Sequence, residues 1–265
     1  MRSMAILLTI TIFFSAREVR AEAPPAPYAN IHTIGIVAAI GDEVTLTKRG
    51  ITLLDTSNST IHLNWGIDEK VSDYLMRALR AAFAVKLVNA DADLQRAFSK
   101  RESNTLMFTD YMRLIGSQAN VDALIVVLPT EAEEQANPSR YSKAFHGLGV
   151  YRDTDLFHAP DYVMLYAMFD LLVVDARTGA LISRVPSRTW GGPPFREGPI
   201  TSACPANVWA APSDLTDVQR NTIRDQMTIL IFFALPRMLS IAGLPFDKSV
   251  SASVPAFPVG CGGPD

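Results

Sequence analysis

Apolar side chains recur along the chain at two spacings, and the spacing distinguishes helices from strands. The stretch 68–84 has helical spacing, with charged residues on the opposite face. Its apolar positions are Val71, Tyr74, Leu75, Ala78, Leu79, Ala82 and Phe83. This pattern predicts an amphipathic helix that packs with one side against a sheet. Helices are also predicted over 104–118, from Asp91 over "DADLQRAF", and over 214–242, the last kinked near Pro236 and ended by Gly243.

Strand-like stretches occupy much of the remaining chain. "IHTIGIVAAIG" and "EVTLTKRG" predict two strands joined as a hairpin by a Gly-Asp turn at 41–42. "TSNST" at 56–60 predicts a turn before a short strand around "IHLNW", and "VKLVN" and "GLGVYR" predict short strands. The nearly continuous apolar run "VDALIVVLPTE" at 121–131 predicts a strand that is covered on both faces.

The longest strand signal runs over 162–175, where alternate residues are apolar. These are Val163, Leu165, Ala167, Phe169, Leu171 and Val173. The other face, with Tyr162, Met164, Tyr166, Met168 and Asp170, is amphipathic, so partial cover is expected there. Gly179 supplies a positive φ for a turn, after which "ALISRVPS" returns antiparallel. Loops are predicted over 132–143, 152–161 and 189–212.

The order of these elements predicts an α/β fold, a mixed sheet flanked by helices. Helices between the strands allow two parallel crossovers, over 61–89 and 85–131. A single domain is expected over 31–243, after a Pro/Ala linker at 22–30 and before a Pro/Gly-rich tail at 244–265. A hydrophobic content of 48% is enough for a sizeable core.

The first residues have the anatomy of a secretory signal peptide. Arg2 precedes the apolar stretch 4–16, and "VRA" at 19–21 suits cleavage after Ala21, although charged residues crowd the segment between them. The alternatives are a buried N-terminal helix and an uncleaved anchor. The stretch 4–16 is too short to span a bilayer, and no later apolar run is longer than "MTILIFFAL" at 227–235. We therefore expect a periplasmic chain without a transmembrane span.

Three segments carry a resemblance to a known group of envelope proteins. They are "VSDYLMRALRAAFAVKLVNADADLQRAF", "VDALIVVLP" and "LLVVDARTGALISR". They resemble the envelope domain shared by the amino-terminal part of TolB, CsgG and penicillin-binding-protein-activating lipoproteins, over about 32–190 and 214–242. The resemblance implies an anticodon-binding-domain-like sandwich and a non-catalytic binding module. The lipobox cysteine and the membrane-inserting hairpins of CsgG have no counterpart, so a lipid anchor and pore formation are not implied.

The chain has two cysteines, Cys204 and Cys261, both in Pro/Gly-rich sequence. In an exported chain an even pair predicts a disulfide, which would pin the C-terminal tail to a loop. Two free thiols are the alternative.

Composition and motifs limit which partners, cofactors and metal ions are expected for this chain. The net charge is −3 and no basic stripe is present, which argues against a nucleic-acid partner. No Gly-x-Ser-x-Gly, P-loop or Gly-x-Gly-x-x-Gly motif occurs, so no cofactor is expected. The segment 146–161 holds His146, Asp153, Asp155 and His158, which could bind zinc or a similar divalent ion. The alternative is a polar surface loop in which the aspartates cap turns.

Two further features admit a functional and a structural interpretation. Asp170, inside a strand, could form a carboxylate pair with Glu131 or Asp122, or it could be a partly exposed partner of a lysine or arginine. Trp190 and Phe195 flank Gly-Gly-Pro-Pro and are interface candidates, unless they fold back onto the core. The apolar stretch from Ile229 to Leu235 favours burial between sheet and tail over a homo-oligomer seam.

The sequence thus predicts an exported, non-catalytic periplasmic or cell-envelope protein with a binding or scaffolding role. Its expected partner is an envelope protein or a second copy of the chain. A metal-dependent hydrolase centred on 146–161 and a subunit of a larger envelope complex are the competing hypotheses.

Overall fold

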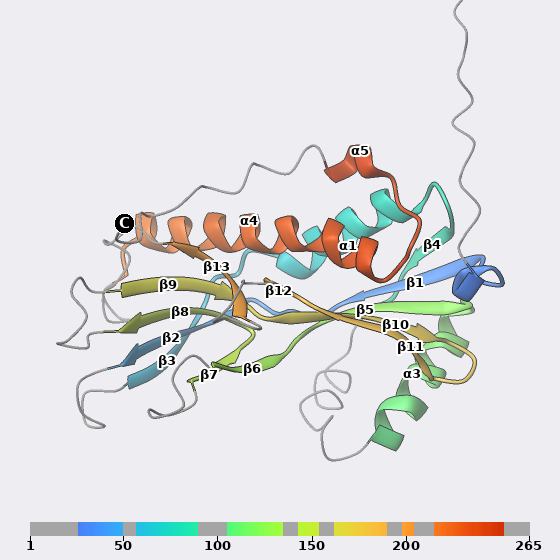
Figure 1. Cartoon of the computed structure of the whole chain (residues 1–265), viewed down its shortest axis with the longest axis horizontal. Coiled ribbons are helices and arrows are strands. Elements are labelled where there is room, and N and C mark those ends of the chain that lie inside the picture. Colours follow the sequence, from blue (N-terminus) through green and yellow to red (C-terminus); the bar gives the residue numbers. More distant parts are fainter. Residues whose placement is uncertain are drawn as a thin grey trace, which may run out of the picture.

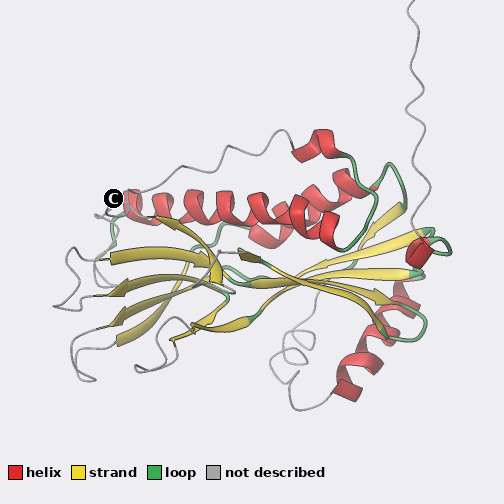
Figure 2. Ribbon diagram, in the orientation of Figure 1, coloured by secondary structure: helices red, strands yellow, loops and turns green. Residues whose placement is uncertain are grey.

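Two mixed β-sheets lie end to end in the computed structural model, with helices packed on both sides (Figures 1 and 2). The helices α1 and α4 cover one side, and α3 lies against the other side of one sheet. The structure describes residues 26–49, 57–89, 105–134, 143–153, 162–189, 198–203 and 215–251. The α/β class with a mixed sheet flanked by helices is confirmed, and the strands are divided between two sheets.

The five-stranded sheet has the order β11-β10-β5-β1-β4. Its central strand β5 is parallel to β1 and antiparallel to β10, while β4 is parallel to β1 and β11 is antiparallel to β10. The strands are β1 (Thr33–Ala38), β4 (Ala84–Leu87), β5 (Ala123–Pro129), β10 (Phe169–Asp175) and β11 (Leu181–Pro186).

The six-stranded sheet has the order β12-β13-β9-β8-β2-β3, in which only β2 and β8 pair in parallel. Its strands are β2 (Glu43–Arg49), β3 (Ser57–His62), β8 (Leu148–Asp153), β9 (Tyr162–Ala167), β12 (Arg188–Thr189) and β13 (Gly198–Ala203). A separate antiparallel ribbon consists of β6 (Glu131–Glu134) and β7 (Lys143–His146).

The helices are η1 (Ala26–Tyr28), α1 (Ile67–Leu79), α3 (Thr105–Ala119), α4 (Asp217–Ile241) and α5 (Lys248–Ser251). Thr216 and Gln219 start α4 with a capping box, in which each side chain bonds to the backbone of the other residue. α4 continues through Pro236, and Gly243 ends it at φ 72°. The backbone N–H of Leu244 then donates to the Leu239 carbonyl, as in a Schellman motif.

The larger core lies between the α1/α4 layer and both sheets. The predicted apolar stripe of α1 supplies Val71, Tyr74, Leu75, Ala78 and Leu79, all buried. The smaller core lies between α3 and the opposite face of the five-stranded sheet. Ala123 to Leu128 in β5 are buried on both faces, as the continuous apolar run predicts.

The β10–β11 hairpin is confirmed. Asp175 closes its turn, since one carboxylate oxygen accepts hydrogen bonds from the backbone N–H groups of Arg177 (3.0 Å) and Thr178 (2.8 Å). Burial raises the pKa of Asp175, but these hydrogen bonds outweigh it and leave the pKa below its ordinary value. Gly179 adopts φ 72° beneath the backbone of Thr109, where a side chain would not fit.

The predicted hairpin at 41–42 is wrong, although both of its strands exist. β1 belongs to one sheet, whereas β2 belongs to the other and pairs with β3 and β8. The backbone N–H groups of Ile40 and Gly41 donate to the Asp68 carboxylate. The Gly-Asp turn therefore passes the chain from one sheet to the next.

The predicted single strand over 162–175 is also divided between the sheets. It breaks at Met168, so that β9 and β10 lie in different sheets. The face expected to be partly covered is fully covered where the structure describes it, because Tyr166, Met168 and Asp170 are all buried. Alternation of apolar residues continues through the break, since both strands keep one face on the shared core.

Smaller differences concern segments with few apolar residues. The strand predicted around "IHLNW" begins earlier, at Ser57, within the expected turn. The predicted loops at 132–143 and 189–212 contain the strand residues of β6 and β13. The predicted helix from Asp91 lies outside the described residues. Tyr28, in the expected linker, and Leu244, in the expected tail, are both buried in the larger core.

Within the described ranges, no helix combines the length and the apolar character that a membrane span requires.

Packing of the six-stranded sheet yields a first prediction. Gly149 in β8 pairs with Tyr166 in β9, and a Cβ at Gly149 would overlap the tyrosine ring. Gly149→Ala should therefore lower the free energy of unfolding by about 1–3 kcal/mol in denaturant titrations. The loss should shrink in a Tyr166→Leu background and persist in Tyr166→Phe, which keeps the ring. Equal losses in all three backgrounds would contradict this packing.

Candidate functional site

A cleft of about 500 Å³ opens where the two sheets meet. It lies at the carboxyl ends of the parallel strands β1 and β5 and at the first residues of β2 and β8. Such strand ends are a frequent position for ligands in α/β proteins. The lining residues are Ala39, Ile40, Gly41, Asp42, Glu43, Thr45, Leu128, Pro129, His146, Gly147 and Leu148.

A ring of backbone hydrogen bonds joins three crossing segments next to the cleft. Thr130 N–H donates to the Met168 carbonyl (3.1 Å), Met168 N–H to the Gly147 carbonyl (2.8 Å), and Gly147 N–H to the Thr130 carbonyl (3.1 Å). Buried Ser187 adds a second link, since its hydroxyl donates to Ala167 O (3.1 Å) and accepts from Phe169 N–H (2.9 Å). The cleft wall around Gly147 is therefore fixed by main-chain bonds.

Two carboxylates hold the turn on the other side of the cleft. Asp68, in the first turn of α1, accepts hydrogen bonds from the backbone N–H groups of Ile40 (2.7 Å) and Gly41 (3.2 Å). Asp42 accepts one from Ile67 N–H (3.3 Å) at the start of the same helix. Burial raises the pKa of Asp68 despite the two hydrogen bonds, and the nearby carboxylates of Asp42 and Glu69 add to this effect.

The remaining polar groups at the cleft are at its rim. His146 is exposed, and so is Glu43, whose carboxylate lies 3.6 Å from His62. Behind the rim, burial raises the pKa of Tyr166 to about 12 against an opposing hydrogen bond with the His146 backbone. The cleft thus combines an apolar floor with a rim of carboxylate and imidazole groups, which suits a small ligand that carries a cationic or hydrogen-bond-donating group.

The predicted metal ligands are only partly described. His146 lines the cleft, while extended strand β8 lies between it and Asp153. Asp155 and His158, like the side chain of Asp153, lie outside the described residues. In the ranges that the structure describes, no three His, Cys, Asp or Glu side chains gather as a metal site would require. The metal site at 146–161 stays a prediction.

Asp170 has an arginine partner, as one of the two interpretations expects. Its carboxylate accepts a hydrogen bond from Arg184 Nε in the neighbouring strand at 2.6 Å. It is fully buried and not partly exposed, because β10 lies in the interior of the sheet. Asp122 has a different role and accepts bonds from the backbone N–H groups of His32 (2.9 Å) and Thr33 (2.8 Å), which hold its pKa below the ordinary value.

The other candidates divide between described and undescribed parts of the chain. Trp190, Phe195, Cys204 and Cys261 lie outside the described residues, so their roles stay predictions. The stretch from Ile229 to Leu235 is described. Leu230, Ile231, Ala234 and Leu235 are buried, whereas Phe233 is 43% exposed.

The sequence interpretation missed the cleft itself and the carboxylates beside it. Asp42 was visible only as part of a turn, and Asp68 only as a polar position on a helix. The available signal was an aspartate in the first turn of a helix, which often bonds to backbone N–H groups. Nothing in the local sequence indicates that the N–H groups belong to a turn between two sheets.

Comparisons with known proteins give only remote likenesses. No model of a known protein family matches the chain, and no curated protein matches it. Among solved structures, lipoprotein GNA1162 from Neisseria meningitidis is 10% identical at a TM-score of 0.27, covering 76% of this chain and 97% of its own. Hypothetical protein CT253 from Chlamydia trachomatis is 9% identical at a TM-score of 0.35, covering 84% and 99%.

A third solved structure, protein XCC0632 from Xanthomonas campestris, is 8% identical at a TM-score of 0.28, covering 80% of this chain and 88% of its own. At these identities and TM-scores the three likenesses carry no inference about function.

The ion pair between buried Asp170 and Arg184, whose side chain is 45% exposed, yields a second prediction. Arg184→Ala should lower the free energy of unfolding by about 2–4 kcal/mol, because it removes the cation that lies 2.6 Å from the buried Asp170 carboxylate. Arg113→Ala is the matched control, since Arg113 pairs with Asp110 at 2.8 Å on an exposed helix face. That change should alter stability by less than about 1 kcal/mol. Equal losses for the two variants in denaturant titrations would contradict the role of Asp170.

The turn beside the cleft yields a third prediction. Since folding raises the Asp68 pKa, its ionisation destabilises the fold, and stability should fall as pH rises from the ordinary value of 3.8 through the folded pKa. Asp68→Asn should therefore gain stability relative to the wild type across this window. Asp68→Ala should lose about 1–3 kcal/mol at every pH, because two backbone N–H groups lose their acceptor.

Chemical unfolding between pH 4 and about 8 tests this pH dependence. Asp73→Asn on the exposed side of α1 is the control, and its effect should be small. An Asp68→Asn difference that stays constant with pH would contradict the prediction.

Proposed function

We propose that the protein is an exported, non-catalytic binding or scaffolding protein of the bacterial cell envelope, and that its ligand binds in the cleft between the sheets. The observation that carries the export part is the leader pattern: Arg2, the apolar stretch 4–16, and the small residue Ala21 at the end of "VRA". The resemblance of 32–190 to envelope binding domains supports the same assignment.

Tyr28, the first buried residue in the described part of the chain, lies after the expected cleavage site. The Tyr28 ring is buried in the larger core, and its hydroxyl donates a hydrogen bond to the Ala242 carbonyl at 2.5 Å. Cleavage after Ala21 would keep this contact on the mature chain.

The chemistry of the cleft supports binding rather than catalysis. Asp68 and Asp42 already accept hydrogen bonds from the backbone that they hold in place. His146 and Glu43 are exposed at the rim of the cleft. Side chains in such positions can determine which ligand binds without contributing to the packing of the core. A small ligand with a cationic group and an apolar body would match both the rim and the floor.

A fourth prediction tests export directly. The protein recovered from a periplasmic extract should lack residues 1–21 by intact mass under denaturing, non-reducing conditions. It should also be lighter than the fully reduced chain by two hydrogen atoms, because Cys204 and Cys261 are expected to be bridged. A full-length mass with free thiols, recovered from the cytosol, would overturn the envelope assignment.

The same preparation separates the competing functions. The hydrolase hypothesis would be favoured if the protein contains stoichiometric zinc or another divalent ion and has hydrolytic activity, and if His146→Ala removes both. Sedimentation of the extract in a large assembly would favour a subunit role. Saturable stabilisation of a metal-free monomer by a cationic ligand, abolished by Glu43→Gln, would support the proposed binding function.

A further inference from the structure

The parallel pairing of β1 with β5 ends at a proline beside the cleft. The register sets Ala38 opposite Val127, and the backbone N–H of Ala39 continues the ladder by donating to the Val127 carbonyl (2.9 Å). In a parallel ladder the Ala39 carbonyl would next accept a hydrogen bond from the N–H of residue 129. Residue 129 is Pro129, the last residue of β5, which has no N–H, so this bond cannot form.

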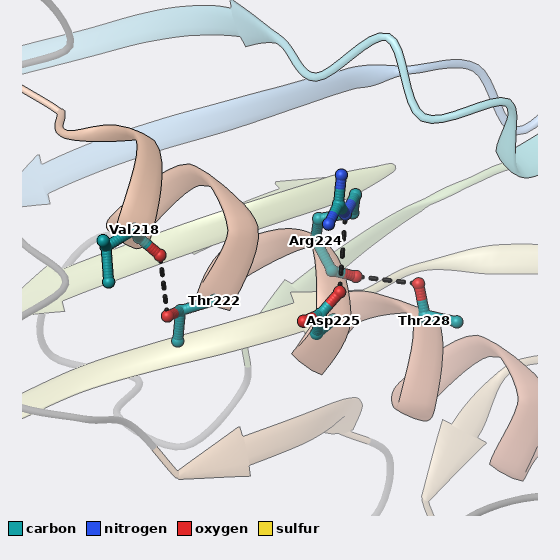
Figure 3. A network of polar contacts seen from close by, with 5 residues as sticks. All are labelled: Val218, Thr222, Arg224, Asp225 and Thr228. Carbon is teal, nitrogen blue, oxygen red and sulfur yellow. Dashed lines mark hydrogen bonds and ion pairs between the residues drawn. The ribbon is translucent and has the colours of Figure 1, made fainter.

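The Ala39 carbonyl therefore lacks the donor that a continuing ladder would supply. Ala39 is 3% exposed, and in the part of the chain that the structure describes, no N–H or O–H group donates to its carbonyl. By contrast, the Val218 carbonyl in α4 accepts a bond from the Thr222 hydroxyl (2.9 Å), as Figure 3 shows. A buried carbonyl without a donor is unfavourable, so the donor for Ala39 has to come from outside these segments.

The cleft is the space from which such a donor can come, because Ala39 and Pro129 both line it. The lining residues that the structure describes include Asp42 and Glu43 but no lysine or arginine. Asp42 already accepts a bond from Ile67 N–H, whereas Glu43 is exposed at the rim. The charge of the lining therefore favours a donor that is also a cation.

The lining also distinguishes between kinds of cation. A quaternary ammonium has no N–H and is typically held by the faces of aromatic rings, but the described lining contains no Phe, Tyr or Trp. The lining instead offers the Ala39 carbonyl and the Glu43 carboxylate, and a primary ammonium carries enough N–H groups to donate to both. The buried side chains of Ile40, Leu128 and Leu148 provide apolar contact for an alkyl chain.

We propose that the cleft binds a primary alkylammonium group, which donates hydrogen bonds to the Ala39 carbonyl and the Glu43 carboxylate while its alkyl chain lies on the apolar floor. The ligand then supplies the N–H that Pro129 lacks. Pro129 is in this way a specificity-determining residue, because it keeps a main-chain acceptor open at the cleft. This inference rests on the proposed binding function and assigns the class of ligand.

Three probes that share one alkyl chain test the ligand class at neutral pH. Hexylamine, which is protonated there, should raise the Tm of the purified protein in a saturable way. N,N,N-trimethylhexylammonium has the same charge and chain but no N–H, so it should bind at least about tenfold more weakly in calorimetric titrations. Hexan-1-ol can donate but has no charge, and it should also bind more weakly than hexylamine.

Pro129→Ala tests the role of the main-chain acceptor. The alanine supplies an N–H opposite the Ala39 carbonyl, so the sheet itself should pair this carbonyl. The variant should bind hexylamine more weakly, and its preference for hexylamine over the trimethyl compound should shrink. The free variant should stay folded, because the new ladder bond offsets the greater freedom of the unfolded chain. Pro245→Ala, in the connection between α4 and α5, is the control and should leave both affinities unchanged.

A second pair of variants tests the carboxylate. Glu43→Gln should weaken hexylamine binding, because it removes the exposed charge at the rim. Asp225→Asn removes the same charge from α4, where the Asp225 carboxylate accepts a bond from Arg224 Nε at 3.4 Å (Figure 3). Asp225 is not a lining residue of the cleft, so this change should leave the affinity unchanged.

The outcomes separate this inference from the proposed function. Equal affinities for hexylamine and its trimethyl analogue, both weakened by Glu43→Gln, would overturn the inference and leave the cleft as a site for cations. Failure of both cations to bind would overturn the inference together with the proposed cationic ligand. Binding that neither Pro129→Ala nor Glu43→Gln changes would place the amine outside the cleft and would likewise overturn the inference.

Discussion

The fold depends on the ring of backbone hydrogen bonds among Thr130, Gly147 and Met168, because it fastens the two sheets to each other. Each residue belongs to a different crossing: the exit from β5, the turn between β7 and β8, and the step from β9 to β10. In an interior, an unpaired backbone N–H or carbonyl is strongly unfavourable. The ring satisfies these groups at the point where both sheets lose their regular pairing, and it makes the division into two sheets possible.

This junction explains why one helical layer serves both sheets. Leu165 and Ala167 in β9 and Phe169 and Leu171 in β10 face the same core, although a break at Met168 separates the strands. α4 covers that core along its length, and α1 covers it over the five-stranded sheet. The cleft forms at this junction because β1 and β5 end there and β2 and β8 begin there. A space remains between these strand ends.

Local patterns were enough to predict the elements but not how they connect. The helical stripe of α1, the buried run of β5 and the turn at Gly179 follow from spacing and turn chemistry within a few residues. The Gly-Asp turn at 41–42 and the strand break at Met168 do not, since a hairpin and a crossing between sheets can use the same residues. Their outcome was decided by partners far along the chain: Asp68 for the turn, and Thr130 and Gly147 for the break.

The cleft was invisible in the sequence for the same reason, because its walls come from four strand ends that only the tertiary fold brings together. The polar groups of the cleft are of two kinds, those that bond to the backbone and those that are exposed. Asp68 and Asp42 bond to the backbone of the turn and the helix start, so removing either hydrogen-bond acceptor should disturb the fold. Glu43 and His146 are exposed at the rim, so substitutions there should change stability little. The exposed rim residues of a junction held by main-chain bonds can therefore be substituted while the core stays the same.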